Sequence, residues 1–155
     1  IFLILIGAKV FNNFLALSGV PMQAAAWVGA LGLTPWVILA AVLLLYLAFG
    51  CVMDSLSMII LTIPILFPIL EGLDFGLPHG EFGLWFGIVV LIVVEVGFIT
   101  PPVGMNLFII NALDRETPIS ETFKGTLPFV ITDLIRVGLL IAFPVLTLGL
   151  VRWVY

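Results

Sequence analysis

Long apolar stretches separated by short polar, proline-rich or glycine-rich segments make up most of the chain. Residues 1–17 predict one apolar helix, and residues 22–32 a short amphipathic helix. Thr34 followed by Pro35 is typical of a helix start, with Thr34 as the cap and Pro35 at the first helical position. Residues 1–33 are therefore predicted to be a transmembrane helix followed by a short amphipathic helix.

The next apolar run, residues 36–70, contains a single charged residue, Asp54, near its middle. Two interpretations compete: two membrane crossings joined by a tight turn, or a re-entrant hairpin whose arms meet inside the membrane. Each arm has about 15 residues, or about 23 Å of helix, whereas a full span needs about 20 residues and 30 Å. The short arms and the turn without Lys or Arg favour a re-entrant hairpin over residues 34–70, with its tip at Gly50–Ser57.

Polar segments divide the second half of the chain. Residues 71–82 and 114–127 predict two solvent loops, and residues 128–155 a final transmembrane helix. The run 83–113 would be about 46 Å long as one helix, which exceeds a membrane crossing. It is therefore predicted to be a discontinuous transmembrane helix broken at Thr100–Gly104. Because only the later loop has Lys and Arg, it is predicted to be cytoplasmic and the earlier loop periplasmic.

Composition places this pattern in a membrane. The 155 residues are 63% hydrophobic and 9% charged, whereas soluble domains have about 25% charged residues. We therefore predict an all-α integral membrane protein in contact with the lipid bilayer. The net charge of −4 argues against nucleic-acid binding, and the single Cys51 excludes an internal disulfide. The sequence begins without an initiator Met or a signal peptide, which predicts the C-terminal part of a longer protein.

The segment Val93–Asn106, VVEVGFITPPVGMN, combines helix-breaking and polar residues within an apolar run. The adjacent prolines open the helix, and Gly97 and Gly104 permit unusual backbone angles. Opened backbone at membrane depth is tolerated where protein buries it or where it lines a cavity, and transporters use it to bind ions. A proline kink used only for packing is the alternative. The density of such residues favours an ion or substrate site built from the carbonyls of Gly97, Phe98 and Val103, the Thr100 hydroxyl and Asn106.

The hairpin tip is the second candidate region. Gly50 ends the first arm, and Asp54, Ser55 and Ser57 provide oxygen atoms beside it. A carboxylate at this depth costs about 3 kcal/mol on insertion scales and is normally paired or hydrated. Asp54 either caps the second arm or contributes to a site, and the two roles are compatible. Glu95 is either a proton carrier or a group that contacts water or a partner helix.

Polar residues elsewhere predict structural roles. Lys9, Asn12 and Asn13 interrupt the first helix and are expected to face a bundle interior, with extension of Lys9 towards the polar interface as the alternative. Asp133 and Arg136 have the spacing of an intrahelical ion pair, expected near the membrane surface, and Pro144 predicts a kink in the last helix. No GxGD or HExxH motif and no Ser/His pair occurs. We therefore predict that the chain is not an enzyme.

Two motifs together, GCVMDSLSMIILTIPILFPIL and EVGFITPPVGMNLFII, closely resemble the large membrane subunit of tripartite ATP-independent periplasmic (TRAP) transporters, the DctM-like family. The similarity covers nearly the whole chain. Because the family's subunit is considerably longer, this chain resembles its C-terminal half. The resemblance implies a sodium-driven elevator transporter of two inverted repeats, each with one re-entrant hairpin and one broken helix.

The resemblance also implies a coupling ion, partners and a location. The partners would be a small four-helix membrane subunit, a periplasmic substrate-binding protein and an organic acid such as a C4-dicarboxylate or sialic acid. The location would be the inner membrane of a bacterium or archaeon. The implied Na⁺ site is formed by Gly50, Gly97, Thr100 and Val103. Candidates for substrate binding or coupling are Asp54, Ser55, Ser57, Glu95, Gly104 and Asn106.

Two alternative functions remain open from the sequence. One is a sodium/carboxylate symporter of similar elevator fold that works without a binding protein. The other is an intramembrane hydrolase that uses Asp54 and Glu95, although no motif brings these carboxylates together.

Overall fold

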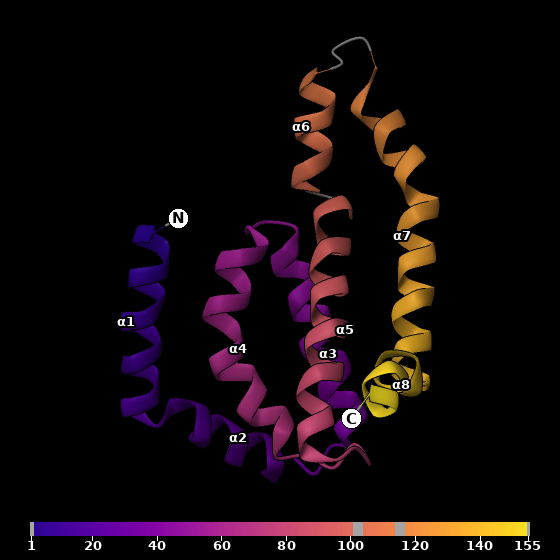
Figure 1. Ribbon diagram of the computed structural model, residues 1–155. Coiled ribbons are helices and arrows are strands. Elements are labelled where there is room, and N and C mark those ends of the chain that lie inside the picture. The colour runs from indigo at the N-terminus through magenta and orange to yellow at the C-terminus, as the bar shows by residue number, and fades with distance from the viewer. Residues whose placement is uncertain (1, 101–103, 114–116, 155) are drawn as a thin grey trace. The chain divides into compact units, whose positions relative to one another are not determined.

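The regular structure of the described residues is entirely helical. The computed structural model describes residues 2–100, 104–113 and 117–154, and every regular element within these ranges is an α-helix (Figure 1). The all-α class predicted from the sequence is thereby confirmed. In chain order the helices are α1 (Phe2–Ser18), α2 (Val20–Ala30), α3 (Pro35–Gly50), α4 (Ser55–Glu71), α5 (His79–Ile99), α6 (Met105–Leu113), α7 (Ile119–Ala142) and α8 (Val145–Val154).

Helix length and composition separate these elements into two groups. Among the described residues, Gly80–Ile99 and Ile119–Ala142 are long and apolar enough to cross a membrane. The helices α1 and α2 meet the same criterion only as a pair, and they are bent by 59° at their junction. The two arms of the predicted hairpin, α3 and α4, have 16 and 17 residues, fewer than the ~20 of a full span. The re-entrant course itself stays a prediction.

The chain divides into two compact units, and the first consists of Ile1–Leu44 with Asp54–Phe82. Within it, α2 turns away from the end of α1 at Gly19, whose φ of 68° is left-handed and therefore suits glycine. The helix α4 packs against both α1 and α2 (Figure 1). The Phe82 ring contacts two other aromatic rings: that of Phe67 on α4, with centroids 5.9 Å apart, and that of Phe75, stacked at 5.1 Å.

A side chain of α1 donates a hydrogen bond to a carbonyl of α4 that a proline leaves without its helical donor. Pro64 lies inside α4 and has no N–H, so the carbonyl of Ile60, four residues earlier, loses its helical donor. The Asn12 side chain donates to this carbonyl through Nδ2 at 3.1 Å. Of the three polar residues expected to face a bundle interior, Asn12 does so, and its partner is the carbonyl that the proline left without a donor. Lys9 and Asn13 are exposed, so the expectation is wrong for them.

Replacing Asn12 by Leu is expected to destabilise the first unit by about 1–3 kcal/mol, because a half-buried carbonyl would lose its donor. The neighbouring Asn13 is exposed on α1, so Asn13→Leu is the matched control and should be nearly neutral. Thermal unfolding of the full gene product in detergent would measure both. In a Pro64→Ala background, which restores the backbone donor, Asn12→Leu should cost little. An equal cost in both backgrounds would contradict this explanation.

The second unit consists of Leu45–Met53 with Gly83–Tyr155. Its centre is formed by large side chains that are almost completely buried, including Tyr46, Trp85, Phe86 and Leu107. The helices α6 and α7 are in contact, and α8 contacts α7. As in the first unit, a side chain supplies the donor that a proline removes: Trp85 Nε1 donates to the carbonyl of Leu140 at 2.9 Å, and residue 144, which would be its helical donor, is proline.

Two predicted boundaries at polar segments are wrong. The loop expected over 71–82 is shorter, because α4 continues to Glu71 and α5 already begins at His79. The Pro78 carbonyl accepts the N–H groups of Glu81 and Phe82, and Glu81 places negative charge in the first turn, where the helix dipole favours it. The glycine-rich composition therefore overstated the length of this loop.

The last third of the chain also differs from the prediction. The predicted loop over 114–127 contains the start of α7 at Ile119, so Pro128 lies inside a helix rather than at its beginning. Pro118 precedes the first helical residue, and Glu121 lies in the first turn. The predicted single helix over 128–155 is divided at Pro144: Phe143 has non-helical angles (φ −127°, ψ 77°), and α8 follows. A proline expected to kink the helix instead ends it.

Candidate ion and substrate site

Two glycines bring the tip of the predicted hairpin against the broken helix. Gly50 is the last residue of α3, and Gly97 lies near the end of α5. A Cβ atom on Gly97 would lie 2.8 Å from Gly50 Cα and 2.9 Å from the Leu47 oxygen, and one on Gly50 would lie 2.9 Å from the Val94 oxygen. All three distances are shorter than real Cβ contacts, so the two backbones touch where only glycine fits. The structure thus brings together Gly50 and Gly97, which the family resemblance placed in one site, and their role as sodium ligands stays a prediction.

The helix break lies where the two prolines occur in the sequence. The helix α5 ends at Ile99 and α6 begins at Met105, with Thr100 and Gly104 in non-helical conformations between them. Residues 101–103 lie outside the described part of the chain, so the predicted carbonyl ligand Val103 cannot be placed. Three of the four predicted sodium ligands, Gly50, Gly97 and Thr100, lie within the described residues.

Thr100 takes part in a local rearrangement of hydrogen bonds at the end of α5. Because residue 101 is proline, the Gly97 carbonyl has no helical donor four residues ahead. The Thr100 N–H donates to it instead at 3.2 Å. This leaves the Val96 carbonyl, which accepts from the Thr100 hydroxyl at 2.6 Å. The hydroxyl uses its hydrogen in this bond, so its oxygen lone pairs remain as acceptors or metal ligands.

The Phe98 carbonyl is the next one affected by the prolines. Its helical donor would be residue 102, which is also proline, so this carbonyl has no helical N–H partner. At membrane depth such an oxygen needs a donor, water or a cation.

Gly104 starts α6 in a conformation that suits glycine. Its φ is 48°, in the left-handed region, and its carbonyl accepts the N–H groups of Leu107 and Phe108. The predicted unusual angle at Gly104 is confirmed. For Gly97 the predicted reason is wrong: it lies within the helix, and contact with Gly50, rather than an unusual angle, requires glycine there.

The charge distribution at this place favours a cation. The last turn of a helix leaves carbonyls without intrahelical donors and has a partial negative charge. The helices α3 and α5 both end here, and Gly50 and Gly97 hold these two like ends in direct contact. The described residues contain no group of three or more His, Cys, Asp and Glu that would hold a metal ion. A cation bound here would therefore be held mainly by backbone and hydroxyl oxygens, which suit hard cations.

Cys51 is a member of this region that the sequence analysis missed. Its buried thiol lies 3.3 Å from the Leu47 oxygen and 3.7 Å from the Thr100 oxygen, as a weak donor to both. It thus connects the last turn of α3 with the end of α5. Its position directly after Gly50 was the available signal, but a cysteine alone suggested only disulfide and metal chemistry.

Asp54 caps the second arm, which confirms one of its two predicted roles. It precedes the first residue of α4 with extended angles, and its side chain accepts the N–H of Ser57 at 2.9 Å. Asp54 is exposed, Ser55 half-buried and Ser57 buried. A capping carboxylate retains further lone pairs, so its use in a site is still a prediction.

The two remaining candidates are exposed. Glu95 lies on α5 shortly before the break, and Asn106 lies in the first turn of α6. Neither side chain is buried in the contact between Gly50 and Gly97. The start of α6 has the opposite polarity to the ends of α3 and α5, because its first N–H groups point out of the helix. The break therefore presents a negative helix end and a positive one in close succession.

Comparison with known proteins identifies the family. The family described as the tripartite ATP-independent periplasmic transporter, DctM component, matches residues 1–146. The chain belongs to this family. It is 33% identical over 150 residues to the C4-dicarboxylate TRAP transporter large permease protein DctM of Pseudomonas aeruginosa, a match that covers 97% of this chain and 34% of the relative. No solved structure is significantly similar to the chain.

Other relatives of the DctM family differ in the substrate that they are named for. The C4-dicarboxylate permease DctM of Rhodobacter capsulatus is 31% identical over 95% of this chain and 32% of its own length. The sialic acid permease SiaM of Vibrio cholerae is 27% identical over 94% of this chain and 33% of its own length. The chain thus spans about a third of the length of the curated relatives it matches.

Membership of the DctM family answers two questions left open by the sequence. These relatives are named as permeases, which leaves the intramembrane hydrolase without support. Family membership, together with the apolar helices long enough to cross a bilayer, also places the chain in the inner membrane.

Proposed function

We propose that the chain forms part of a TRAP transporter large permease that takes up organic acids coupled to Na⁺. The observation that supports this function best is the contact of Gly50 with Gly97, which joins two helix C-termini at the break between α5 and α6. Two negative helix ends in contact repel each other unless a positive charge lies between them. A sodium ion would provide that charge and would use the oxygens that the prolines leave without donors.

In this proposal the ligands of Na⁺ come from both sides of the contact. The candidates are the main chain at Gly50, Gly97 and Phe98, the Thr100 hydroxyl, and Val103. Sodium binding would hold the hairpin tip against the break, and the start of α6 would then face the substrate carboxylate through its N–H groups. Gly104 and Asn106 lie at this helix start, and Asp54, Ser55 and Ser57 at the start of α4, so each is a candidate substrate contact.

Coupling follows if sodium and substrate need the same arrangement of the tip and the break. Each would then favour binding of the other, which is the coupling free energy that drives uptake against a gradient. We further propose that the hairpin enters from the periplasmic side and that the transport unit moves as an elevator. The partners would be a small four-helix membrane subunit and a periplasmic binding protein that delivers a C4-dicarboxylate, sialic acid or a related acid.

Replacing Thr100 by Val tests the sodium site. The change removes one oxygen while keeping the shape, and is expected to raise the sodium concentration for half-maximal uptake about tenfold, equivalent to about 1.4 kcal/mol. The maximal rate should change less. The measurement is uptake by the full gene product with its partner subunits in proteoliposomes, over a sodium series and a panel of organic acids.

Two further variants separate ligand loss from structural damage. Thr100→Ser retains the hydroxyl and should behave like the wild type. Thr126 on α7 makes the same kind of bond to carbonyls of its preceding turn, those of Thr122 and Phe123, so Thr126→Val removes a comparable bond at a residue that is not among the predicted sodium ligands. An unchanged sodium dependence in Thr100→Val, or an equal change in Thr126→Val, would remove Thr100 from the site.

A further inference from the structure

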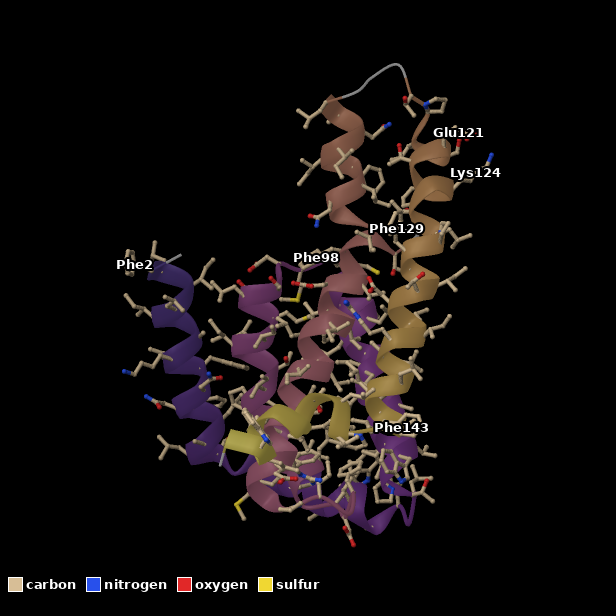
Figure 2. The ribbon with its side chains drawn as sticks, turned by 45° about the vertical axis from the view of Figure 1, so that its right-hand side comes forward. Phe2, Phe98, Glu121, Lys124, Phe129 and Phe143 are labelled. Atoms are coloured by element: carbon tan, nitrogen blue, oxygen red, sulfur yellow. The ribbon has the colours of Figure 1, made fainter. Side chains whose placement is uncertain are left out.

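The helix α7 has two ion pairs of identical spacing in different surroundings. Lys124 bonds Glu121 at 2.9 Å, and Arg136 bonds Asp133 at 2.9 Å, each across three residues. The first pair lies at the polar start of α7 and projects away from the helix (Figure 2). The second lies in residues 125–142, a stretch that has no other charged residue.

Arg136 is held away from the nearer end of this apolar stretch. Ala142 ends α7 six residues later, about 9 Å along the axis. A long basic side chain near a helix end normally extends towards the polar interface. Here Cα–Cβ bonds tilt towards the helix N-terminus, and the bond to Asp133 directs the guanidinium towards the middle of the stretch. The expected position of this pair near the membrane surface stays a prediction.

The guanidinium has more donors than this pair satisfies. Arginine has five N–H donors, whereas the ion pair joins one guanidinium nitrogen to one carboxylate oxygen, and the Arg136 side chain is 53% exposed. Charged side chains in membrane-spanning segments almost always face protein or a water-filled cavity, because exposure to lipid is costly. The free donors of Arg136 thus require oxygen acceptors from outside α7.

The position of the pair on α7 defines a narrow surface. Phe129, Asp133 and Arg136 follow each other at spacings of four and three residues, so they lie along one edge of the helix. This edge borders the buried stripe that includes Val130 and Val137. Phe129 itself is 66% exposed. A charged pair on this edge is costly to expose to lipid, whereas polar groups of a neighbouring helix can hydrogen-bond to it.

We propose that this edge of α7, defined by Phe129, Asp133 and Arg136, binds a second transmembrane helix of the same transporter that lies outside these 155 residues. That helix presents carboxylate or carbonyl oxygens to Arg136 and an apolar surface to Phe129. The positive charge and free N–H donors of Arg136 favour a partner helix that has such oxygen acceptors. Further helices are available because the relatives are about three times as long as this chain.

Alanine substitution of each pair provides a matched comparison. Asp133→Ala with Arg136→Ala would leave the partner's acceptors without donors, so at least about tenfold less assembled protein should survive a fixed heating step. Glu121→Ala with Lys124→Ala removes a pair of the same spacing that is exposed at the polar end, and should change survival by less than about twofold. If the Asp133 and Arg136 edge faced lipid, its alanine variant would survive as well as the wild type or better.

Photo-crosslinking tests the occupant without disturbing the pair. The photoreactive residue p-benzoylphenylalanine at Phe129 should form an adduct with a peptide outside the 155 residues, identified by mass spectrometry of the purified, reconstituted transporter. The same residue at Ile131, which is exposed on the opposite side of α7, should react with lipid. Lipid adducts at both positions, or a Phe129 adduct within residues 1–44 or 54–82, would overturn the proposal. Neither readout depends on sodium or on uptake.

Discussion

Replacing Gly97 by Ala is expected to reduce sodium-dependent uptake by at least about tenfold. The added Cβ would lie 2.8 Å from Gly50 Cα and 2.9 Å from the Leu47 oxygen. Both obstacles are backbone atoms, so no side chain can rotate to make room, and overpacking of this kind costs about 1–3 kcal/mol or more. The tip of α3 would have to move away from the end of α5.

The control for this change lies on the same helix. Gly87 is also within α5, but a Cβ there would meet no atom within 4 Å. Gly87→Ala should therefore leave uptake unchanged and stabilise the helix slightly, since alanine is a better helix former by about 1 kcal/mol. Uptake in proteoliposomes and thermal unfolding of the same preparations measure both variants. Normal uptake by Gly97→Ala would show that the contact with Gly50 is not required.

Replacing Trp85 by Phe is expected to lower the stability of the second unit by about 2–3 kcal/mol. Trp85 is completely buried, and its indole N–H is the donor to the Leu140 carbonyl, which Pro144 leaves without a backbone partner. The variant loses this hydrogen bond, leaves a half-buried acceptor unsatisfied and creates a small cavity. Circular dichroism during heating of the full gene product would follow the loss.

Two comparisons separate the hydrogen bond from the change in volume. Trp153→Phe makes the same chemical change at a side chain that is 84% exposed, and should be nearly neutral. Pro144→Ala supplies a backbone N–H four residues after Leu140, so Trp85→Phe should cost less in that background. The difference between the two backgrounds is the contribution of the hydrogen bond. If Trp85→Phe lowers the stability equally in both backgrounds, the loss comes from the smaller ring alone and not from the hydrogen bond.

Features that depend on backbone chemistry were predictable from the sequence. The end of α3 at Gly50, the cap at Asp54 and the interruption between Ile99 and Met105 follow from glycine, proline and aspartate acting on their own segments. The contact of Gly50 with Gly97 was predictable only because both segments were expected to form one site. The sodium assignment rests on the family and on this geometry, and stays a proposal.

Features that depend on contacts distant in the chain were not predictable. Pro64 and Pro144 signalled disturbed helices, but the donors at Asn12 and Trp85 lie 48 and 55 residues from the carbonyls that they satisfy. No local pattern identifies such a partner. The start of α7 was missed for a different reason: Pro128 resembles a first-turn proline, and the polar residues before it resemble a loop, although they form the exposed first turns of a helix.

The meeting of Gly50 and Gly97 has a consequence for how a bound ion would escape. Lids and gates in proteins open by movement of loops or domains. Here the closest atoms belong to two main chains, which have no rotatable group between them. In the proposed transporter the hairpin tip would therefore have to withdraw as a piece, and an ion held there would be released in a single step.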